Sequence, residues 1–424
     1  MNFRKFFKVL GPGMITGAAD DDPSGIATYS QTGAQFGYSL LWTAVFMLPL
    51  QIAIQEACAR IGAVTGKGIA AVVKEHYNKN ILYTVIILIL IANIINIGVD
   101  IGAMAVAAQL LVPANFIFLT LLFTIIMLVL EVFLPYRTYA NILKWLCLAL
   151  IAYPITVFII DEHWSTLLKA TFIPHIEFHF QYLFIITGVL GTTISPYLFF
   201  WQASEEVEEE KQIKHLTWHN GKPHIGWKFI SNLRLDNSIG MLFSEIGTWC
   251  IIVVAASVLN KHGITDIKTA ADAAAALEPL VKSFPHAGYI AKVIFAIGIL
   301  GLGFLSVPVL AGSAAYALGE ALNWQVGLNL KFNQAHGFYS IIIIATLIGL
   351  SINLIGINPI KALVYSAVIN GVIAVPLIFI IAFIARSKKI MGKYQSGILS
   401  TFFVWVTFLS MCVAASGMFF SFLK

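Results

Sequence analysis

The stretch GAADDDPSGIATYS, residues 17–30, places three consecutive aspartates and a proline inside a long apolar part of the chain. Apolar residues precede it in VLGPGMIT and follow it in SLLWTAVFMLPLQIAIQ. A carboxylate in the middle of a bilayer costs about 2.5–3.5 kcal/mol on insertion scales, so function is the default explanation for Asp20, Asp21 and Asp22. Because Pro23 lacks an N–H group, the stretch also predicts a membrane helix that is interrupted in its middle.

The composition of the whole chain is typical of an integral membrane protein. Of its 424 residues, 59% are hydrophobic and 11% are charged, whereas soluble domains carry about 25% charged residues. Apolar runs near the ~20 residues that cross a bilayer predict an all-α protein with about 11 spans, because barrel strands would instead alternate over ~10 residues. The predicted spans are 11–34, 39–61, 81–110, 115–134, 140–160, 181–204, 231–259, 287–319, 337–355, 359–385 and 398–422.

The distribution of positive charge predicts the orientation in the membrane. With the N-terminus inside, most of the 26 Lys and Arg residues fall on cytoplasmic loops, as the positive-inside rule requires. We therefore expect a multi-pass protein of the cell membrane, in a bacterium the inner membrane, with the lipid bilayer as its surroundings and a cytoplasmic N-terminus.

A second interrupted span lies five spans after the first. The run YLFIITGVLGTTISPYLFFWQAS, residues 182–204, contains Gly191 and a Ser195-Pro196 pair. Interrupted helices at matching places in two halves indicate the central site of a transporter. We expect breaks at Pro23, Ser24, Gly191 and Pro196 in one transmembrane domain, 1–424, with a first repeat over 1–160, a second of inverted topology over 161–385, and an accessory span within 386–424.

Two explanations for the aspartates remain open at this point. Asp22 could meet a cation at the break, or it could cap the second half of the helix, since Asp is a good N-cap residue. Helical spacing turns successive side chains by ~100°, so three adjacent acids cannot all face one ion. We expect Asp22 to face the ion, and Asp20 and Asp21 to line the pathway or contact another partner.

The residues at both breaks resemble a known family. GPGMITGAADDDPSG is similar to the first-span signature GPG…DPGN of the Nramp divalent-metal transporters, QTGAQFGYSLLW and ARIGAVTGKGIA continue the likeness, and GTTISPYLFF stands where the family has GATVMPHNLY. The resemblance implies a LeuT-like five-plus-five inverted repeat with a metal site between spans one and six. The ligands it implies are Asp22, Gly25 in place of an Asn, Ser195 in place of a Met, and the Thr192 carbonyl.

Other matched positions depart from the family pattern. Tyr197 replaces the His of MPH, Asp100 matches the third-span Asp that the family links to proton movement, and the ninth-span arginines have no counterpart. Thioethers favour softer metals such as manganese, whereas oxygen ligands suit Mg²⁺, which retains water. The site therefore favours Mg²⁺ with Mn²⁺ tolerated, as in the divergent Nramp-related magnesium transporters. An ordinary Mn²⁺/Fe²⁺ proton symporter is the first alternative.

Two further classes of membrane protein are possible for a chain with this pattern of spans. A sodium-coupled permease for amino acids or organic solutes would offer backbone N–H groups to a carboxylate, which an acidic triplet would repel; a non-transporting receptor or channel is a third possibility. No enzyme, nucleotide or nucleic-acid motif is evident, so we expect no cofactor, with the metal as substrate.

Glu56 is expected on a polar pathway or in a local pair, and the run EEVEEE, 205–210, on a solvated face. The oligomeric state is left open.

Overall fold

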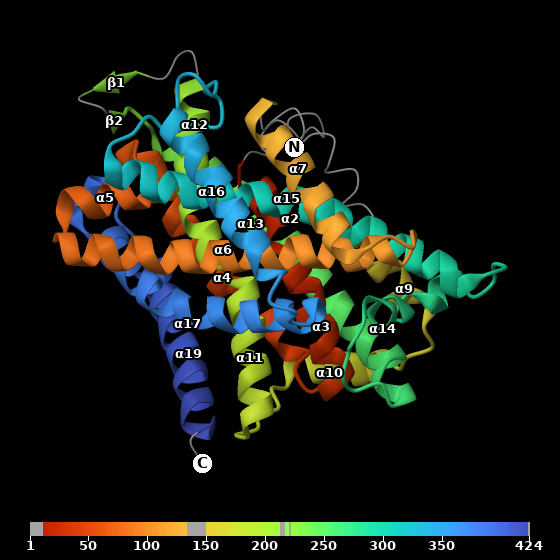
Figure 1. Ribbon diagram of the computed structural model, residues 1–424. Coiled ribbons are helices and arrows are strands. Elements are labelled where there is room, and N and C mark those ends of the chain that lie inside the picture. Colours follow the sequence, from red (N-terminus) through yellow and green to blue (C-terminus); the bar gives the residue numbers. More distant parts are fainter. Residues whose placement is uncertain (1–11, 134–149, 213–216, 220–221, 423–424) are drawn as a thin grey trace.

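The computed structural model describes residues 12–133, 150–212, 217–219 and 222–422 (Figure 1). Long helices dominate, and eight of the helices in this part of the chain are long and apolar enough to cross a membrane. The predicted all-α membrane protein is therefore confirmed. These eight are α4 (Trp42–Thr65), α6 (Lys79–Gln109), α7 (Phe116–Phe133), the α11–α12 pair (Phe180–Gln212), α13 with η2 (Trp227–His262), α15 (Ala287–Leu322), α17 (Pro359–Arg386) and α19 (Ile398–Phe422).

The remaining predicted spans are also accounted for where the structure describes them. The first is divided into α2 (Pro12–Asp20) and α3 (Pro23–Phe36), and the ninth is the shorter apolar helix α16 (His336–Ile352). The fifth, 140–160, lies partly outside the described residues and ends in α9 (Ala152–Ile159). The sixth continues beyond its predicted end, because α12 extends to Gln212.

Short elements connect the long helices. They are α5 (Ile69–His76), α10 (Trp164–Phe172), α14 (Ala270–Ala275), α18 (Lys388–Met391), the 3₁₀ helices η2 (Asn260–His262), η3 (Glu278–Val281) and η4 (Gly392–Tyr394), and the antiparallel strands β1 (Trp218–His219) and β2 (Lys222–Pro223). Trp218 pairs with Pro223, and His219 pairs with Lys222.

The two broken spans pack against helices of the opposite half of the chain. α13, the helix after the second break, contacts both α2 and α3 of the first break. α4, the helix after the first break, contacts α12 of the second break. α6 and α15 pack against each other, and α19 lies beside α11 and α17, near the C-terminus in Figure 1. This reciprocal packing places both interruptions inside the helix bundle, where unwound backbone can be buried in protein.

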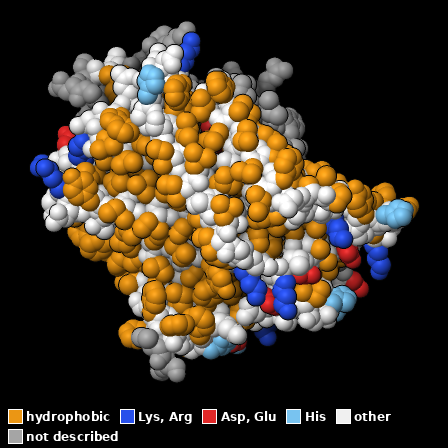
Figure 2. Space-filling model, in the orientation of Figure 1, with side chains coloured by type: hydrophobic (Ala, Val, Ile, Leu, Met, Phe, Trp, Pro, Cys, Tyr) orange, Lys and Arg blue, Asp and Glu red, His pale blue; other side chains and the backbone are white. Residues whose placement is uncertain are grey.

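The outer surface of the bundle is apolar. Hydrophobic side chains cover most of the face in Figure 2, and charged side chains gather toward its edges. Large hydrophobic side chains are exposed along α7 and α19, including Phe118, Ile125, Phe402 and Phe419. Soluble monomers rarely expose apolar patches of this extent, so this surface fits contact with lipid.

Gly191 was expected at the second break, and this expectation is wrong. It lies inside α11 (Phe180–Thr193), two residues before the end of that helix. A Cβ atom at this position would stand 2.1 Å from the Ala367 carbonyl oxygen and 2.2 Å from the Gly371 nitrogen of α17. The glycine is required because small residues let membrane helices approach closely.

We expect Gly191→Ala to destabilise the protein by about 3 kcal/mol, because neither backbone atom of α17 can move away cheaply. The thermal unfolding midpoint in detergent measures the effect. Gly226→Ala is the matched control, since a Cβ at Gly226 meets nothing within 4 Å. Equal midpoints for the two variants would show that α11 and α17 are not in such close contact.

Candidate metal site

The first break follows from the local sequence between α2 and α3. Asp22 has an extended backbone (φ −66°, ψ 173°) and is the N-cap of α3, with Pro23 as the first helical residue. Its Oδ1 atom accepts a hydrogen bond from the Gly25 N–H at 2.7 Å and one from the Ser24 hydroxyl at 2.7 Å. Asp22 therefore does cap the second half-helix, as one of the two explanations predicted, and the cap uses one of its two oxygens.

The second break is formed by Ile194 and Ser195, between α11 and α12 (Pro196–Gln212). The Ile194 N–H donates to the Leu190 carbonyl at 2.9 Å and ends α11. The Ser195 hydroxyl donates to the carbonyls of Thr192 at 2.6 Å and Gly191 at 3.0 Å. Pro23 and Pro196 thus begin the second half-helices, and Ser24 lies in the first turn of α3.

The two breaks meet on one side of Asp22. The Tyr197 hydroxyl donates to the Ala19 carbonyl at 2.8 Å and to Asp22 Oδ2 at 3.3 Å. The Ser24 and Thr192 hydroxyls lie 3.4 Å apart. A Cβ at Gly25 would stand 3.3 Å from Thr192 Oγ1, so the missing side chain of Gly25 lies toward the second break. Asp22 Oδ2 is consequently the less strongly bonded oxygen, and it faces α12.

Asp20 and Asp21 face other helices. Gln51 Nε2 of α4 donates to Asp20 Oδ2 at 2.6 Å and to the Thr193 carbonyl at 3.0 Å. The Ser244 hydroxyl of α13 donates to Asp20 Oδ2 at 2.5 Å and to Asp21 Oδ1 at 3.2 Å. Sequence reasoning missed Gln51 and Ser244, although a glutamine in the middle of the apolar second span was a usable signal.

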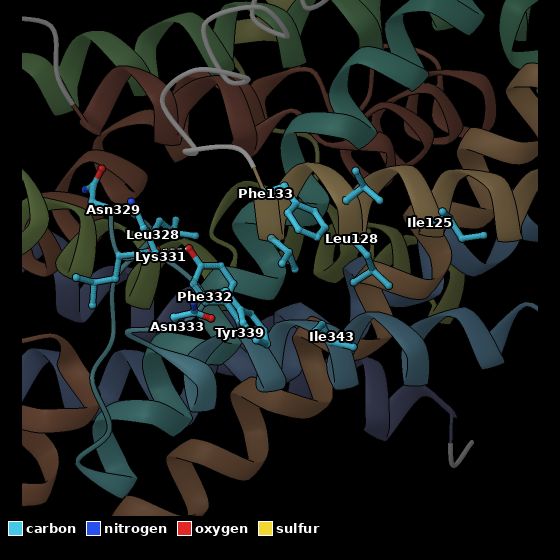
Figure 3. Close-up of a pocket in the computed structure, with 13 residues that line it drawn as sticks. Ile125, Leu128, Phe133, Leu328, Asn329, Lys331, Phe332, Asn333, Tyr339 and Ile343 are labelled. Atoms are coloured by element: carbon cyan, nitrogen blue, oxygen red, sulfur yellow. Dashed lines mark hydrogen bonds between the residues drawn. The ribbon is translucent and has the colours of Figure 1, made fainter.

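The residues around the breaks provide mainly oxygen donors. Within the described residues, no group of three or more His, Cys, Asp or Glu side chains is placed to hold a metal ion by itself. A metal at the break would therefore bind one carboxylate, backbone carbonyls, hydroxyls and retained water. A pocket of about 840 Å³ lies elsewhere, where α7 and α16 contribute apolar side chains such as Leu128 and Ile343, and it includes no break residue (Figure 3).

Comparison with known proteins identifies the family. The profile of the natural resistance-associated macrophage protein-like family, Nramp, matches residues 13–421. The chain belongs to the Nramp family. The resemblance seen at the two breaks is therefore confirmed over nearly the whole length of the chain.

Several proteins of known name and structure are similar to this Nramp protein. The divalent metal cation transporter MntH of Bacillus subtilis is 26% identical over 428 residues, covering 97% of this chain and 90% of that protein. MntH of Caldanaerobacter subterraneus is 24% identical over 402 residues, covering 93% and 88%.

Among solved structures, an Eremococcus coleocola manganese transporter has a TM-score of 0.76 at 15% identity, covering 100% of this chain and 90% of that chain. Mhp1, a nucleobase-cation-symport-1 family transporter, has a TM-score of 0.60 at 13% identity, covering 97% and 90%. These structural likenesses confirm the LeuT-like fold with broken helices one and six.

Two further acids predicted from the sequence have their hydrogen-bond or ion-pair partners outside the breaks of this Nramp protein, although Asp100 lies within electrostatic range of Asp22. Asp100 of α6 is buried and accepts a hydrogen bond from the Ser306 hydroxyl of α15 at 2.8 Å. Glu56 of α4 forms ion pairs with Arg60 and Arg234, with N···O distances of 2.9 and 2.8 Å. Of the two expectations for Glu56, the local pair is the one that the structure contains.

The interpretation of 205–210 as a solvated face is wrong. Glu205, Glu206, Glu208 and Glu210 are all buried in the Nramp fold. Glu208 accepts hydrogen bonds from the Tyr316 hydroxyl at 2.6 Å and the Leu328 N–H at 2.8 Å. Glu208 therefore fixes the end of α12 to α15 and to the segment that follows it.

Proposed function

We propose that this Nramp protein moves divalent metal cations across the membrane by alternating access, with Asp22 as the anchoring ligand. The observation that carries the proposal is the meeting of two helix breaks around a buried carboxylate, of which one oxygen is held by the cap and the other faces α12. The MntH relatives bear the name divalent metal cation transporter, which supports the same class of substrate. The metal is substrate, and the protein is a transporter with no enzymatic step.

The carbonyls near the breaks support cation binding. α2 and α11 both end here, and the carbonyl end of a helix carries partial negative charge. The carbonyls of Ala19, Thr192 and Thr193 accept hydrogen bonds from side chains, respectively from Tyr197, Ser195 and Gln51. Rotation of a side chain would release each carbonyl to a cation without unwinding a helix. We therefore propose that Thr192 and Ser195 complete the ligand shell with water.

The donor chemistry favours Mg²⁺, with Mn²⁺ as a second substrate. Ser195 supplies a hydroxyl where a thioether would select softer metals, Gly25 brings no side-chain ligand, and oxygen donors with retained water suit Mg²⁺. Asp20, Asp21 and Asp100 would line the pathway. We also propose a cytoplasmic N-terminus in a bacterial inner membrane, and the repeat boundaries 1–160 and 161–385.

Uptake into proteoliposomes tests this function. The purified chain is reconstituted, and uptake of Mg²⁺, Mn²⁺ and Ca²⁺ is measured with and without a pH gradient. We expect Mg²⁺ and Mn²⁺ uptake that is insensitive to the gradient. Mn²⁺ uptake alone, driven by protons, would favour the ordinary Mn²⁺/Fe²⁺ symporter. Absence of uptake for every metal would contradict the proposal.

Ser195→Met should shift selectivity toward softer metals. A thioether beside the Thr192 carbonyl adds a ligand that Mn²⁺ or Cd²⁺ accepts better than Mg²⁺ does, so we expect their uptake relative to Mg²⁺ to rise about tenfold, equivalent to about 1.4 kcal/mol. Competition of Mn²⁺ or Cd²⁺ with Mg²⁺ uptake measures the shift.

Ser366→Met is the matched control for that selectivity experiment. Ser366 is another buried serine, and its hydroxyl donates to the carbonyl three residues earlier in the chain, Leu363, at 2.8 Å. It lies in α17, and its hydroxyl bond stays within that helix and involves neither break. Equal metal preferences in the Ser195 and Ser366 variants would remove Ser195 from the ligand shell.

A further inference from the structure

We propose a second cation-binding position on the opposite face of the first break, between α2, α4 and α13. Its donors are Asp20, Asp21 and Glu245, together with Gln51, Ser244 and Thr248. The divalent nature of its ion rests on the proposed function, whereas the position itself rests on contacts that do not include Asp22.

The acidic and polar groups of this position lie close together. The Ser244 hydroxyl bridges Asp20 and Asp21, and Gln51 donates to Asp20. A Cβ at Gly247 would stand 3.1 Å from Asp21 Oδ2, so α13 passes directly beside that carboxylate. Glu245 follows Ser244 in α13 and lies within electrostatic range of both aspartates. Three carboxylates thus share one region of the bundle.

Several side-chain oxygens of this region have no hydrogen-bond partner. Asp20 Oδ1, Gln51 Oε1, both carboxylate oxygens of Glu245 and Thr248 Oγ1 are buried and accept or donate no hydrogen bond. Asp20 and Gln51 belong to the cluster through their other side-chain atoms, and Thr248 lies one helical turn after Ser244 on the same face of α13. Buried polar atoms are normally paired, so several unpaired oxygens around one place indicate a missing ligand.

The carboxylates of this position also lack a positively charged partner in an ion pair, within the part of the chain that the structure describes. The ion pairs found among the described residues involve none of Asp20, Asp21 or Glu245. Buried carboxylates without a counter-charge are costly, and a cation among them would offset that cost. The donors are all oxygen, which suits hard cations such as Mg²⁺. Because no three acids among the described residues converge at metal-binding distance, the ion would keep part of its water, as Mg²⁺ usually does.

The two positions are separate in geometry. Asp22 accepts a hydrogen bond from Tyr197 of α12. Asp20 accepts one from Gln51 of α4, and both Asp20 and Asp21 accept one from Ser244 of α13. Two positions on opposite faces of one break would let one ion wait while another is bound by Asp22. The three consecutive aspartates then serve two ions instead of one.

Equilibrium dialysis of the full chain in detergent against Mn²⁺ tests the second position. We expect two Mn²⁺ ions per wild-type chain, one for Glu245→Gln, one for Asp22→Asn and none for the double variant. Glu131→Gln is the matched control, because Glu131 of α7 is another buried carboxylate with both oxygens unpaired. This control should retain two ions.

The possible outcomes separate the two proposals. One ion in the wild type and one in Glu245→Gln would overturn the second position, and the cluster would then hold protons instead. Unchanged binding in Asp22→Asn, with loss of one ion in Glu245→Gln, would contradict the Asp22 site and leave the second position standing. Glu245→Asp retains the negative charge and should bind two ions, provided that a cation is the missing partner.

Discussion

Asp22→Asn is expected to abolish divalent-cation uptake while the protein remains folded. Asparagine is as good an N-cap as aspartate, so its side-chain oxygen can still accept the Gly25 N–H bond that holds α3. The negative charge is lost, and a buried cation deprived of its charged partner loses about 3 kcal/mol or more. That loss corresponds to about a 100-fold fall in uptake.

Uptake of Mg²⁺ into proteoliposomes, together with the thermal midpoint, measures this effect. Asp272→Asn is the control, because Asp272 also accepts a backbone N–H bond at the start of a helix, from Thr269 at 2.9 Å, but lies in α14 away from the breaks. It should transport normally. If Asp22→Asn transported as well as the control, Asp22 would be a helix cap and nothing more.

Arg60→Met is expected to cause the largest loss of stability. Arg60 is fully buried and forms two bonds to Glu56, at 2.9 and 3.0 Å, one to the Tyr394 carbonyl at 2.8 Å and one to the Ser396 hydroxyl at 2.7 Å. Methionine fills part of the volume but leaves the Tyr394 carbonyl and the Ser396 hydroxyl without this donor, and Glu56 keeps only the more exposed Arg234 as its charged partner. Breaking a buried ion pair by removing one member costs about 3–5 kcal/mol.

The thermal midpoint of Arg60→Met in detergent is compared with that of Lys67→Met. Lys67 pairs with Glu75 at 2.6 Å, but the two side chains are 40% and 50% exposed. Exposed pairs contribute about 0–1 kcal/mol, so this control should unfold near the wild-type temperature. Similar midpoints for both variants would mean that Arg60 does not join α4 to the segment before α19.

The positions of both breaks could be predicted because their causes are local. A proline without an N–H group, preceded by Asp22 or Ser195, begins each second half-helix. The proximity of Tyr197 to Asp22 could also be expected, since both belong to motifs of one family. The sequence does not reveal the role of Gly191, because a glycine near a break and a glycine at a close helix contact look alike in a sequence.

The neighbours of the break could not be predicted from periodicity. α4 is buried along most of its length, so no apolar stripe shows which side Gln51 faces. Ser244 contacts Asp20 across more than half of the chain, and nothing local records that pairing. The run 205–210 resembles a solvated face in the sequence because the partners of Glu208, Tyr316 and Leu328, come from a distant helix and the segment that follows it.

The most direct test of the central claim is anomalous X-ray diffraction from crystals of the full chain soaked in Mn²⁺. The account predicts an anomalous peak bonded to Asp22 Oδ2, between the two breaks, at about 2.0–2.2 Å as expected for oxygen ligands of small divalent ions. It would be contradicted by an empty break in which Asp22 only caps α3 through Gly25 and Ser24.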